Sequence, residues 1–332
     1  MVVFIKNKLS FMNKLSFSIK AVVFLTAAVV TGCTDRRGER QDQGRTEACW
    51  IYAMTECVER EMWSTGDTVE LSRQWLVARC LEEQTLQRRL SRGAMSVNMR
   101  GVGPEALRLI GAYGLVPFVH EKSRTVNSRT LQRRLTLLAD QSTATHGSVT
   151  ALLDSATDLL PHFTVARYDD TDPAASTFYL YGMQYTARSF AESIMYRQHW
   201  QWFASSTHHP YGKPFALEVA DNRHYHEYTN LPMTDILQRT LRSLRQGHPV
   251  YWEMGRRPST QPGGGGADSD HAMAIIGLHT DAKGKTWLVC QNSYGRRWGH
   301  GGTTRVSLPY FTAHTCNVGI LGDANDCFGR HQ

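Results

Sequence analysis

The sequence lacks an apolar stretch long enough to cross a bilayer as a helix. Its apolar run AVVFLTAAVV covers only the ten residues 21–30, about half of what a membrane-spanning helix needs. The chain also has little excess charge once residues 1–32 are set aside. These hold four lysines and no acid, so residues 33–332 carry 33 basic against 30 acidic side chains. This balance argues against a nucleic-acid-binding protein.

Other class signatures are missing as well. No CxxC or paired Cys/His spacing indicates structural zinc. The GGGG run at 263–266 does not stand between a strand and a helix, as a phosphate-binding loop would, so it is interpreted as a loop. No internal repeat is visible. What remains is an ordinary globular composition, with 332 residues and 41% hydrophobic side chains, enough for one large or two small domains.

The N-terminus has the pattern of an export signal. Lysines precede the apolar run, and Val30-Thr31-Gly32-Cys33 follows it. Small residues before a cysteine resemble the bacterial lipobox, which implies a signal peptide over 1–32, cleavage before Cys33 and lipid on its thiol. Residues 33–42 would then form a short tether, placing the protein in the bacterial cell envelope on the periplasmic face or the cell surface. A plain secretory signal with a chance cysteine is the alternative, and Met12 is a second possible start.

The chain has seven cysteines. If Cys33 carries lipid, six remain, and in an oxidising compartment six can pair in 15 ways. The pair closest in sequence near the C-terminus, Cys316 and Cys327, is the best candidate for a disulfide.

One thiol stands at the start of a predicted helix. Apolar residues from Trp50 to Met62 recur at three- and four-residue steps, which predicts an amphipathic helix of about fourteen residues. Cys49 falls in its first turn, where the helix dipole and the unpaired N–H groups favour a thiolate and so should lower its pKa. Cys57, two turns further on, is predicted to be a buried, inert thiol. Cys49 by itself could also be a small core residue.

A reactive thiolate needs a base, and the base needs a group that orients it. His271 opens the apolar run AMAIIGL, which predicts a buried strand. Asn292 follows a second β-rich run, WLVC. Two neighbouring strands could hold the imidazole and the carboxamide side by side. A neutral amide can fix the ring without adding a second negative charge beside the thiolate.

These stretches together resemble the papain-like cysteine peptidases. QGRTEACW (43–50) resembles the family's Gln–x5–Cys-Trp signature, DHAMAIIG (270–277) its histidine strand and NSYGRRWG (292–299) its asparagine motif. The order along the chain also agrees. The resemblance implies an α+β, papain-like two-lobed fold, with a helical lobe that carries the cysteine and a β-barrel-like lobe that carries the histidine and asparagine.

The resemblance also implies roles for individual residues. Cys49 would be the nucleophile, His271 the acid and base, Asn292 the orienting group and the Gln43 amide an oxyanion donor beside the Cys49 backbone N–H. A further four residues match substrate-binding positions: Gly101, Asp270, Ala272 and Trp298. The family needs no metal and no cofactor.

Two positions depart from the family pattern. Thr46 stands where many secreted members have a cysteine, so that disulfide is absent and Cys80 is expected to be a free thiol. Tyr294 replaces the tryptophan that shields the histidine–asparagine hydrogen bond. Tyrosine can still cover that bond, but it admits more water.

The spacing predicts an insertion. The family pattern places the histidine about 130–150 residues after the cysteine, whereas Cys49 and His271 are 222 residues apart. The roughly 70–90 extra residues are expected between Pro117 and Phe215. The peptidase domain, 43–332, would thus comprise a helical lobe (43–116), an insertion-containing region (117–215) and a β-rich lobe (216–332).

Local patterns add detail to the middle of the chain. Two helices are predicted at 131–139 and 149–160, and a hairpin followed by a helix at 176–194. The stretches 205–222 and 228–254, the latter read as a helix and then a strand, resemble the bleomycin hydrolase/aminopeptidase C branch of the family.

Histidines gather between 208 and 226. His224 and His226 would point the same way on a strand and could form a ligand pair, but histidine-rich polar loops are common. The prediction is therefore that the protein holds no metal.

The function that these patterns predict is hydrolysis of peptide bonds in extracytoplasmic peptides or unfolded proteins. The expected partners are that substrate and the membrane, through the lipid on Cys33. Nucleic acid is not expected, and an oligomer is possible. Two alternatives stay open: a membrane-tethered peptide-binding protein on the same scaffold, and a thiol amidase of cell-wall peptides. Exopeptidase and endopeptidase activity are not distinguished.

Overall fold

A computed structural model of the chain describes residues 41–118, 128–160, 177–217, 223–255 and 271–322. All of them belong to one unit, Arg40–Gln332. The predicted signal peptide and the predicted lipidation site at Cys33 lie outside the described residues. Within the described part, no helix has both the length and the apolar character needed to cross a membrane.

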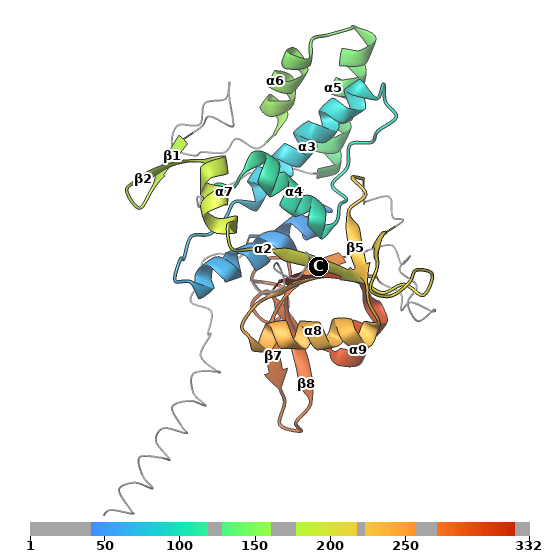
Figure 1. Cartoon of the computed structure of the whole chain (residues 1–332). Helices are drawn as coiled ribbons and strands as arrows, with labels where there is room; N and C mark the ends of the chain where they lie inside the picture. The colour runs from blue at the N-terminus through green and yellow to red at the C-terminus, as the bar shows by residue number, and fades with distance from the viewer. Residues whose placement is uncertain (1–40, 119–127, 161–176, 218–222, 256–270, 323–332) are drawn as a thin grey trace, which may run out of the picture. The chain divides into compact units, whose positions relative to one another are not determined.

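Three helices form the first half of the fold (Figure 1). They are α2 (Cys49–Ser64), α3 (Arg73–Leu90) and α4 (Gly103–Tyr113). The start of α3 is fixed by Ser72, whose hydroxyl accepts a hydrogen bond from the Trp75 N–H at 3.3 Å. In α4, Pro104 stands in the first turn, where its missing N–H costs nothing. The helix predicted at Cys49 is confirmed and is buried along most of its length.

A buried ion cluster fixes α2 to the start of α3. Arg73 contacts Glu59 at 2.6 Å and Glu56 at 3.0 Å, and the side chains of Arg73 and Glu59 are almost fully buried. The Leu71 N–H also donates to Glu59 at 2.6 Å. Burying a charged side chain is energetically tolerated only when the charge is paired and hydrogen-bonded. The cluster therefore holds the two helices in one fixed arrangement.

The middle of the chain contains the helices and the hairpin that the sequence predicts. The elements are α5 (Ser128–Ala144), α6 (Val149–Leu159), β1 (Thr177–Leu180), β2 (Met183–Thr186) and α7 (Ala187–Met195). Helices α5 and α6 pack on α3 (Figure 1), and Arg88 of α3 bonds Asp140 of α5 at 2.8 Å. Helix α7 begins in a capping box in which Thr186 and Ser189 satisfy each other's backbone N–H groups.

The second half of the fold is built on an eight-stranded sheet. Its order is β4-β5-β3-β10-β6-β7-β8-β9, and every pair is antiparallel except β3 with β5. Strand β3 and the first two residues of β4 precede residue 216, where the β-rich lobe was predicted to begin. The bounds are β3 Trp200–Ala204, β4 Pro214–Ala216, β5 Glu227–Asn230, β6 Val250–Met254, β7 His271–Thr280, β8 Thr286–Gln291, β9 Thr303–Ser307 and β10 Thr315–Leu321.

The two faces of the sheet bury different layers. Along β7, Ala272 and Ala274 belong to the core shared with α2, whereas Met273 and Ile275 belong to a second core. This is the two-residue alternation of a strand that is covered on both faces. Helices α8 (Met233–Arg245) and α9 (Leu308–His314) cover the second face. Consequently α2 packs directly on β7, the strand that starts at the predicted catalytic histidine.

Candidate active site

Cys49 is the first residue of α2 and is half-buried. Ala48 before it offers no side chain to cap the helix, so the first N–H groups of α2 are available to other acceptors. Trp50, which follows, is almost fully buried, and its indole N–H donates to the Met99 carbonyl at 2.8 Å. The tryptophan therefore anchors the start of the helix.

His271 and Asn292 are brought together by the pairing of β7 with β8. Ala274 is paired with Gln291, so the start of β7 lies beside the residue that follows β8. The imidazole Nε2 of His271 is 2.8 Å from Asn292 Oδ1. The predicted side-by-side placement of imidazole and carboxamide is thus present.

The hydrogen bonds around Asn292 define the tautomer of His271. The Ser293 backbone N–H donates to Asn292 Oδ1 at 2.8 Å, so the atom in that position is an acceptor. An acceptor can meet His271 Nε2 only if that nitrogen carries the proton. The neutral ring therefore carries its lone pair on Nδ1, the nitrogen that can take up a proton.

The thiol of Cys49 meets the same strand. The backbone of Ala272, the residue after His271, is close enough to lower the pKa of this thiol. Ala272 is itself almost fully buried. The nucleophile candidate and the base candidate thus stand at the starts of two elements, α2 and β7, that pack directly on one another.

The protonation of Cys49 differs from the prediction. Burial raises the pKa of its thiol to about 12, and the nearby charge of Glu253 raises it further, against hydrogen bonds from Ala272, Trp50 and Cys49 backbone groups that lower it. The position at a helix start predicts a lowered pKa for Cys49. This prediction was wrong for the thiol in the absence of a proton-accepting partner. Desolvation by the packed strand and helix outweighs the helix N-terminus. A partner that accepts the proton is needed to form the thiolate at neutral pH.

Glu253 is a buried carboxylate that the sequence reasoning missed. It is paired with Ala272 across β6 and β7 and is almost fully buried. It accepts hydrogen bonds from the Gly103 N–H at 2.8 Å, the Tyr251 hydroxyl at 2.5 Å and the Asn317 amide at 2.7 Å. Glu253 thus joins the start of α4 to the sheet beside the thiol. The available signal was one acid in the otherwise apolar strand VYWEM.

Gln43 is fixed by two neighbours. Its backbone N–H donates to the Ser293 carbonyl at 2.8 Å, and its Oε1 accepts from the Ser293 hydroxyl at 2.5 Å. Its Nε2 donates one proton to the Thr46 carbonyl at 2.6 Å, and the Thr46 hydroxyl donates back to the Gln43 carbonyl at 2.9 Å. Thr46, the residue in place of the family's cysteine, therefore fastens this loop with hydrogen bonds. Ser293, to which the sequence reasoning gave no role, links Gln43 to the Asn292 segment.

Tyr294 covers the imidazole. Its ring lies parallel to that of His271, with centroids 5.5 Å apart and an interplanar angle of 4°. Trp298, a predicted substrate-binding residue, lies next to Tyr294 with ring centroids 6.3 Å apart. Tyr294 remains 38% exposed, so it covers the ring while leaving the site open to solvent.

Gly101 lies against the residue that follows the nucleophile. A Cβ at this position would be 2.6 Å from the indole ring of Trp50, closer than any real contact. Only glycine allows the chain to pass here. This puts the Gly101 backbone close to the start of α2, where the substrate-binding role predicts it. Asp270 lies outside the described residues.

A small pocket adjoins Asn292 on the side of α2. Its walls combine apolar and charged groups from the helix, the strands and the loop before Gln43. The lining residues are Gln41, Tyr52, Ala53, Glu56, Arg73, Ala272, Gln291, Asn292 and Ser293.

The other described thiols are buried in the core. Cys57, Cys80 and Cys290 are free and almost fully buried, which confirms the prediction of an inert Cys57 and a free Cys80. Burial raises the pKa of each. Cys327 lies outside the described residues, so its pairing with Cys316 stays a prediction.

One group of described side chains could hold a metal ion. Glu105, His224 and His226 offer ligand atoms that all lie within 4.8 Å of one another. The predicted reason for this pairing was wrong, because His224 and His226 lie in the turn before β5 and not on a strand. They converge all the same.

Comparison with solved structures defines the fold. PepW from Lactobacillus rhamnosis HN001 is similar to this chain with a TM-score of 0.60 and 15% identity, over 90% of this chain and 84% of that one. Procathepsin L 3 from the larval midgut of Tenebrio molitor has a TM-score of 0.37 and 15% identity, over 87% and 68%. No protein-family model and no curated protein sequence matches the chain. The similarity to PepW shows that the fold is the predicted α+β, papain-like one.

Proposed function

We propose that this chain is a cysteine peptidase in which Cys49 attacks peptide carbonyl groups and His271 transfers the protons. The observation that carries the proposal is the 2.8 Å contact between His271 Nε2 and Asn292 Oδ1, on a strand against which α2, the helix that begins at Cys49, packs directly. Nucleophile, base and orienting group are the parts that thiol acyl transfer requires.

In the first half of the reaction, His271 Nδ1 takes the proton of the Cys49 thiol and the sulfur attacks the substrate carbonyl carbon. The S–C bond forms, and the carbonyl oxygen becomes an oxyanion. The imidazolium then gives its proton to the leaving nitrogen as the C–N bond breaks. In the second half, His271 takes a proton from water, whose oxygen attacks the thioester carbon. The C–S bond then breaks, the acid is released, and the imidazolium returns its proton to the sulfur.

The imidazole is what makes the sulfur reactive. Because burial raises the pKa of Cys49 to about 12, almost no thiolate forms at neutral pH without a proton acceptor beside it. Cationic neighbours such as an imidazolium are among the features that lower the pKa of reactive cysteines to roughly 3.5–7.5. Asn292 orients the ring without contributing charge, so the imidazolium's positive charge stays available to the thiolate.

Two donors are available for the oxyanion. The Cys49 backbone N–H opens α2, where N–H groups have no partner within the helix. The Gln43 amide nitrogen gives one of its two protons to Thr46, which leaves the other for the oxyanion. Removing a single donor of this kind costs about 100- to 1000-fold in rate.

The proposed substrates are peptides or unfolded proteins outside the cytoplasm, met by an enzyme anchored through lipid on Cys33. The lipobox-like Val30-Thr31-Gly32-Cys33 supports the anchor. The unit of α8 followed by β6, ahead of the histidine strand, and the residues of 205–222 and 228–254 support the bleomycin hydrolase/aminopeptidase C branch. Labelled palmitate incorporated into the full chain, and lost in Cys33→Ala, tests the anchor separately from the chemistry.

The activity is tested with Cys49→Ala and with Cys80→Ala as the matched control, which removes a buried thiol outside the site. Both are assayed on free and N-blocked peptides, on unfolded proteins and on muropeptides. Cys49→Ala should lose all turnover and all labelling by an epoxide thiol reagent, and Cys80→Ala should keep both. Turnover by Cys49→Ala would contradict the proposal. So would a wild-type protein that binds peptides without cleaving them, or one that cleaves only muropeptides.

A further inference from the structure

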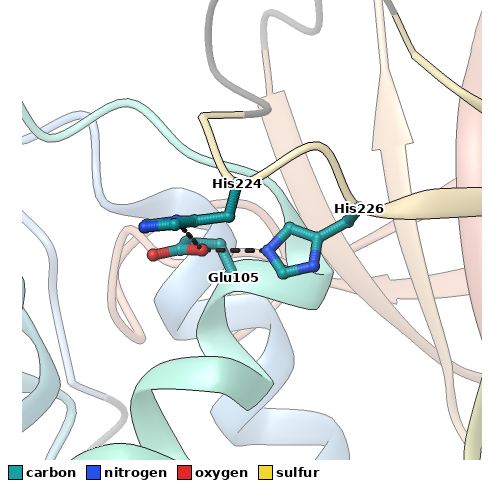
Figure 2. Close-up of side chains that lie close together, drawn as sticks. All are labelled: Glu105, His224 and His226. Atoms are coloured by element: carbon teal, nitrogen blue, oxygen red, sulfur yellow. Dashed lines mark hydrogen bonds and ion pairs between the residues drawn. The ribbon is translucent and has the colours of Figure 1, made fainter.

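We propose that Glu105, His224 and His226 bind one divalent transition-metal ion, of which zinc is the best match. His224 Nδ1 and His226 Nε2 lie 2.8 and 2.9 Å from the same oxygen, Glu105 Oε2. Figure 2 shows the two rings approaching the carboxylate from different directions, from a turn more than a hundred residues away in the sequence. Three ligand atoms from two separate elements are thus already gathered around one point.

The turn is bent in a way that brings the two histidines together. Tyr225, between them, has a φ of 51°, in the left-handed region that a non-glycine residue adopts at a cost. Its side chain is 78% exposed, so no packing of the tyrosine ring accounts for this backbone. What the conformation does is place His224 and His226 on the same carboxylate.

The donor set selects a class of ion. Two imidazole nitrogens and one carboxylate oxygen are typical zinc ligands, with bonds of about 2.0–2.2 Å, and three protein ligands leave a fourth position for water. Calcium and magnesium prefer oxygen ligands throughout. Tetrahedral bonds of that length separate the ligand atoms by roughly 3.3 Å. Each nitrogen would therefore move a few tenths of an ångström away from Glu105 Oε2, in a cluster whose three ligand atoms already lie within 4.8 Å of one another.

A second layer of side chains holds the ligands. Arg108 donates to Glu105 Oε1 at 2.9 and 2.7 Å, which leaves Oε2 for the imidazoles. Arg108 also bonds Glu83 at 2.8 Å, and Glu83 lies 3.8 Å from Nε2 of His224. The second nitrogen of a ligating histidine usually faces such a carboxylate, which fixes the ring and strengthens the ligand. The carboxylates of Glu83 and Glu105 and the guanidinium of Arg108 together carry a net charge of −1, which favours binding of a cation.

The proposed ion would join two parts of the fold. Glu105 lies in the first turn of α4, and the histidines lie in the turn before β5. Because the ligands are ordered only in the folded chain, metal binding adds to the stability of the fold. The inference does not depend on the peptidase proposal, since none of the three ligands has a role in that mechanism.

The test uses the full chain with Cys49→Ala, so that zinc cannot bind the Cys49–His271 pair. After incubation with zinc and dialysis, the metal content is measured by mass spectrometry and the melting temperature is compared in zinc and in EDTA. One zinc per chain is expected, with a melting temperature about 3–6 °C higher than in EDTA. Cobalt in place of zinc should give the strong visible bands of a four-coordinate ion.

The ligands are tested with His224→Gln and His226→Gln, which keep a polar side chain, against His208→Ala, an exposed histidine outside the cluster. The two ligand variants should lose the bound zinc and the shift in melting temperature, and the control should keep both. If a ligand variant fails to fold, the zinc content and the cobalt spectrum of the Cys49→Ala parent chain decide whether the metal binds. No bound zinc in the parent, or equal zinc in parent and ligand variants, overturns the proposal.

Discussion

Among the places in the described part of the chain where a histidine ring meets a side-chain oxygen, two differ in the charge of that oxygen. His271 is bonded to the neutral amide of Asn292, whereas His224 and His226 both meet the carboxylate of Glu105. The distances are the same within about a tenth of an ångström, from 2.8 to 2.9 Å. Geometry alone therefore does not distinguish the two groups.

The difference in charge separates what each group can do. An amide orients a ring and leaves its positive charge, once protonated, for another partner, here the Cys49 thiolate. A carboxylate neutralises that charge itself and, with the protons removed, becomes a ligand for a cation. One group thus suits proton transfer and the other suits metal binding. The predictions below exchange or remove members of each group.

The largest effect is expected from His271→Ala. Without the imidazole, the sulfur has no proton acceptor, and kcat/KM for peptide cleavage should fall by about 10⁴-fold or more. His279→Ala, on the same strand β7, is the control and should stay near wild type. A drop of less than tenfold for His271→Ala would show that another group takes the proton.

The next largest effect is expected from Asn292→Asp, which gives His271 the kind of partner that Glu105 provides. The added negative charge disfavours the thiolate and should lower kcat about 100-fold, whereas KM should rise by a smaller factor. The acid limb of the pH profile should move to higher pH, since a carboxylate raises the pKa of its imidazole. An unchanged pH profile would mean that Asn292 acts only through packing.

Glu105→Gln makes the opposite exchange and is measured by stability in EDTA. Burial alone would raise the pKa of Glu105, but hydrogen bonds from His226 and Arg108 lower it from 4.5 to about 2. The ionised carboxylate thus stabilises the fold fully above about pH 4.5 and loses that contribution as the pH falls towards 2. Urea unfolding should show wild type more stable than Glu105→Gln by about 2 kcal/mol at neutral pH, after allowance for solvent screening.

That advantage of the wild type should disappear as the pH falls towards 2. The exposed carboxylate of Glu192 supplies the control, Glu192→Gln, which should have nearly the stability of wild type at neutral pH. A difference between wild type and Glu105→Gln that persists at low pH would contradict the role of the Glu105 charge.

The smallest effect is expected from Tyr294→Ala. Removing the ring stacked on His271 admits water to the hydrogen bond with Asn292 and should lower kcat/KM by about 3- to 10-fold. The chain contains a matched stack elsewhere, Tyr310 on His314, with ring centroids 4.0 Å apart. Tyr310→Ala should leave the activity unchanged, and an equal loss in both variants would point to a general effect on folding.

Much of the fold could be predicted from local patterns. The apolar spacing after Cys49 gave α2, and the turn residues around Gly182 gave the hairpin of β1 and β2, because helix and strand periodicities and turn chemistry are local properties. The partnership of His271 and Asn292 was predicted from resemblance, and the structure brings the two together.

What could not be predicted depends on residues far apart in the sequence. The raised pKa of Cys49 comes from desolvation by tertiary packing, which a helix start in the sequence does not reveal. Glu105 and the histidine pair are 119 and 121 residues apart, and the positive φ of Tyr225 has no signature in the residue types. Ser293 and Glu253 were missed because the partners that give them a role, Gln43 and Gly103, are 250 and 150 residues away.

The central claim is that His271 converts a thiol that burial would keep protonated into a reactive thiolate. The most direct test is the rate of Cys49 alkylation by an epoxide reagent as a function of pH, in wild type and in His271→Ala. Wild type should react rapidly and at a nearly constant rate around neutral pH. His271→Ala should react only as the pH approaches about 12, the pKa that burial gives the isolated thiol. The same pH profile for both proteins would contradict the account.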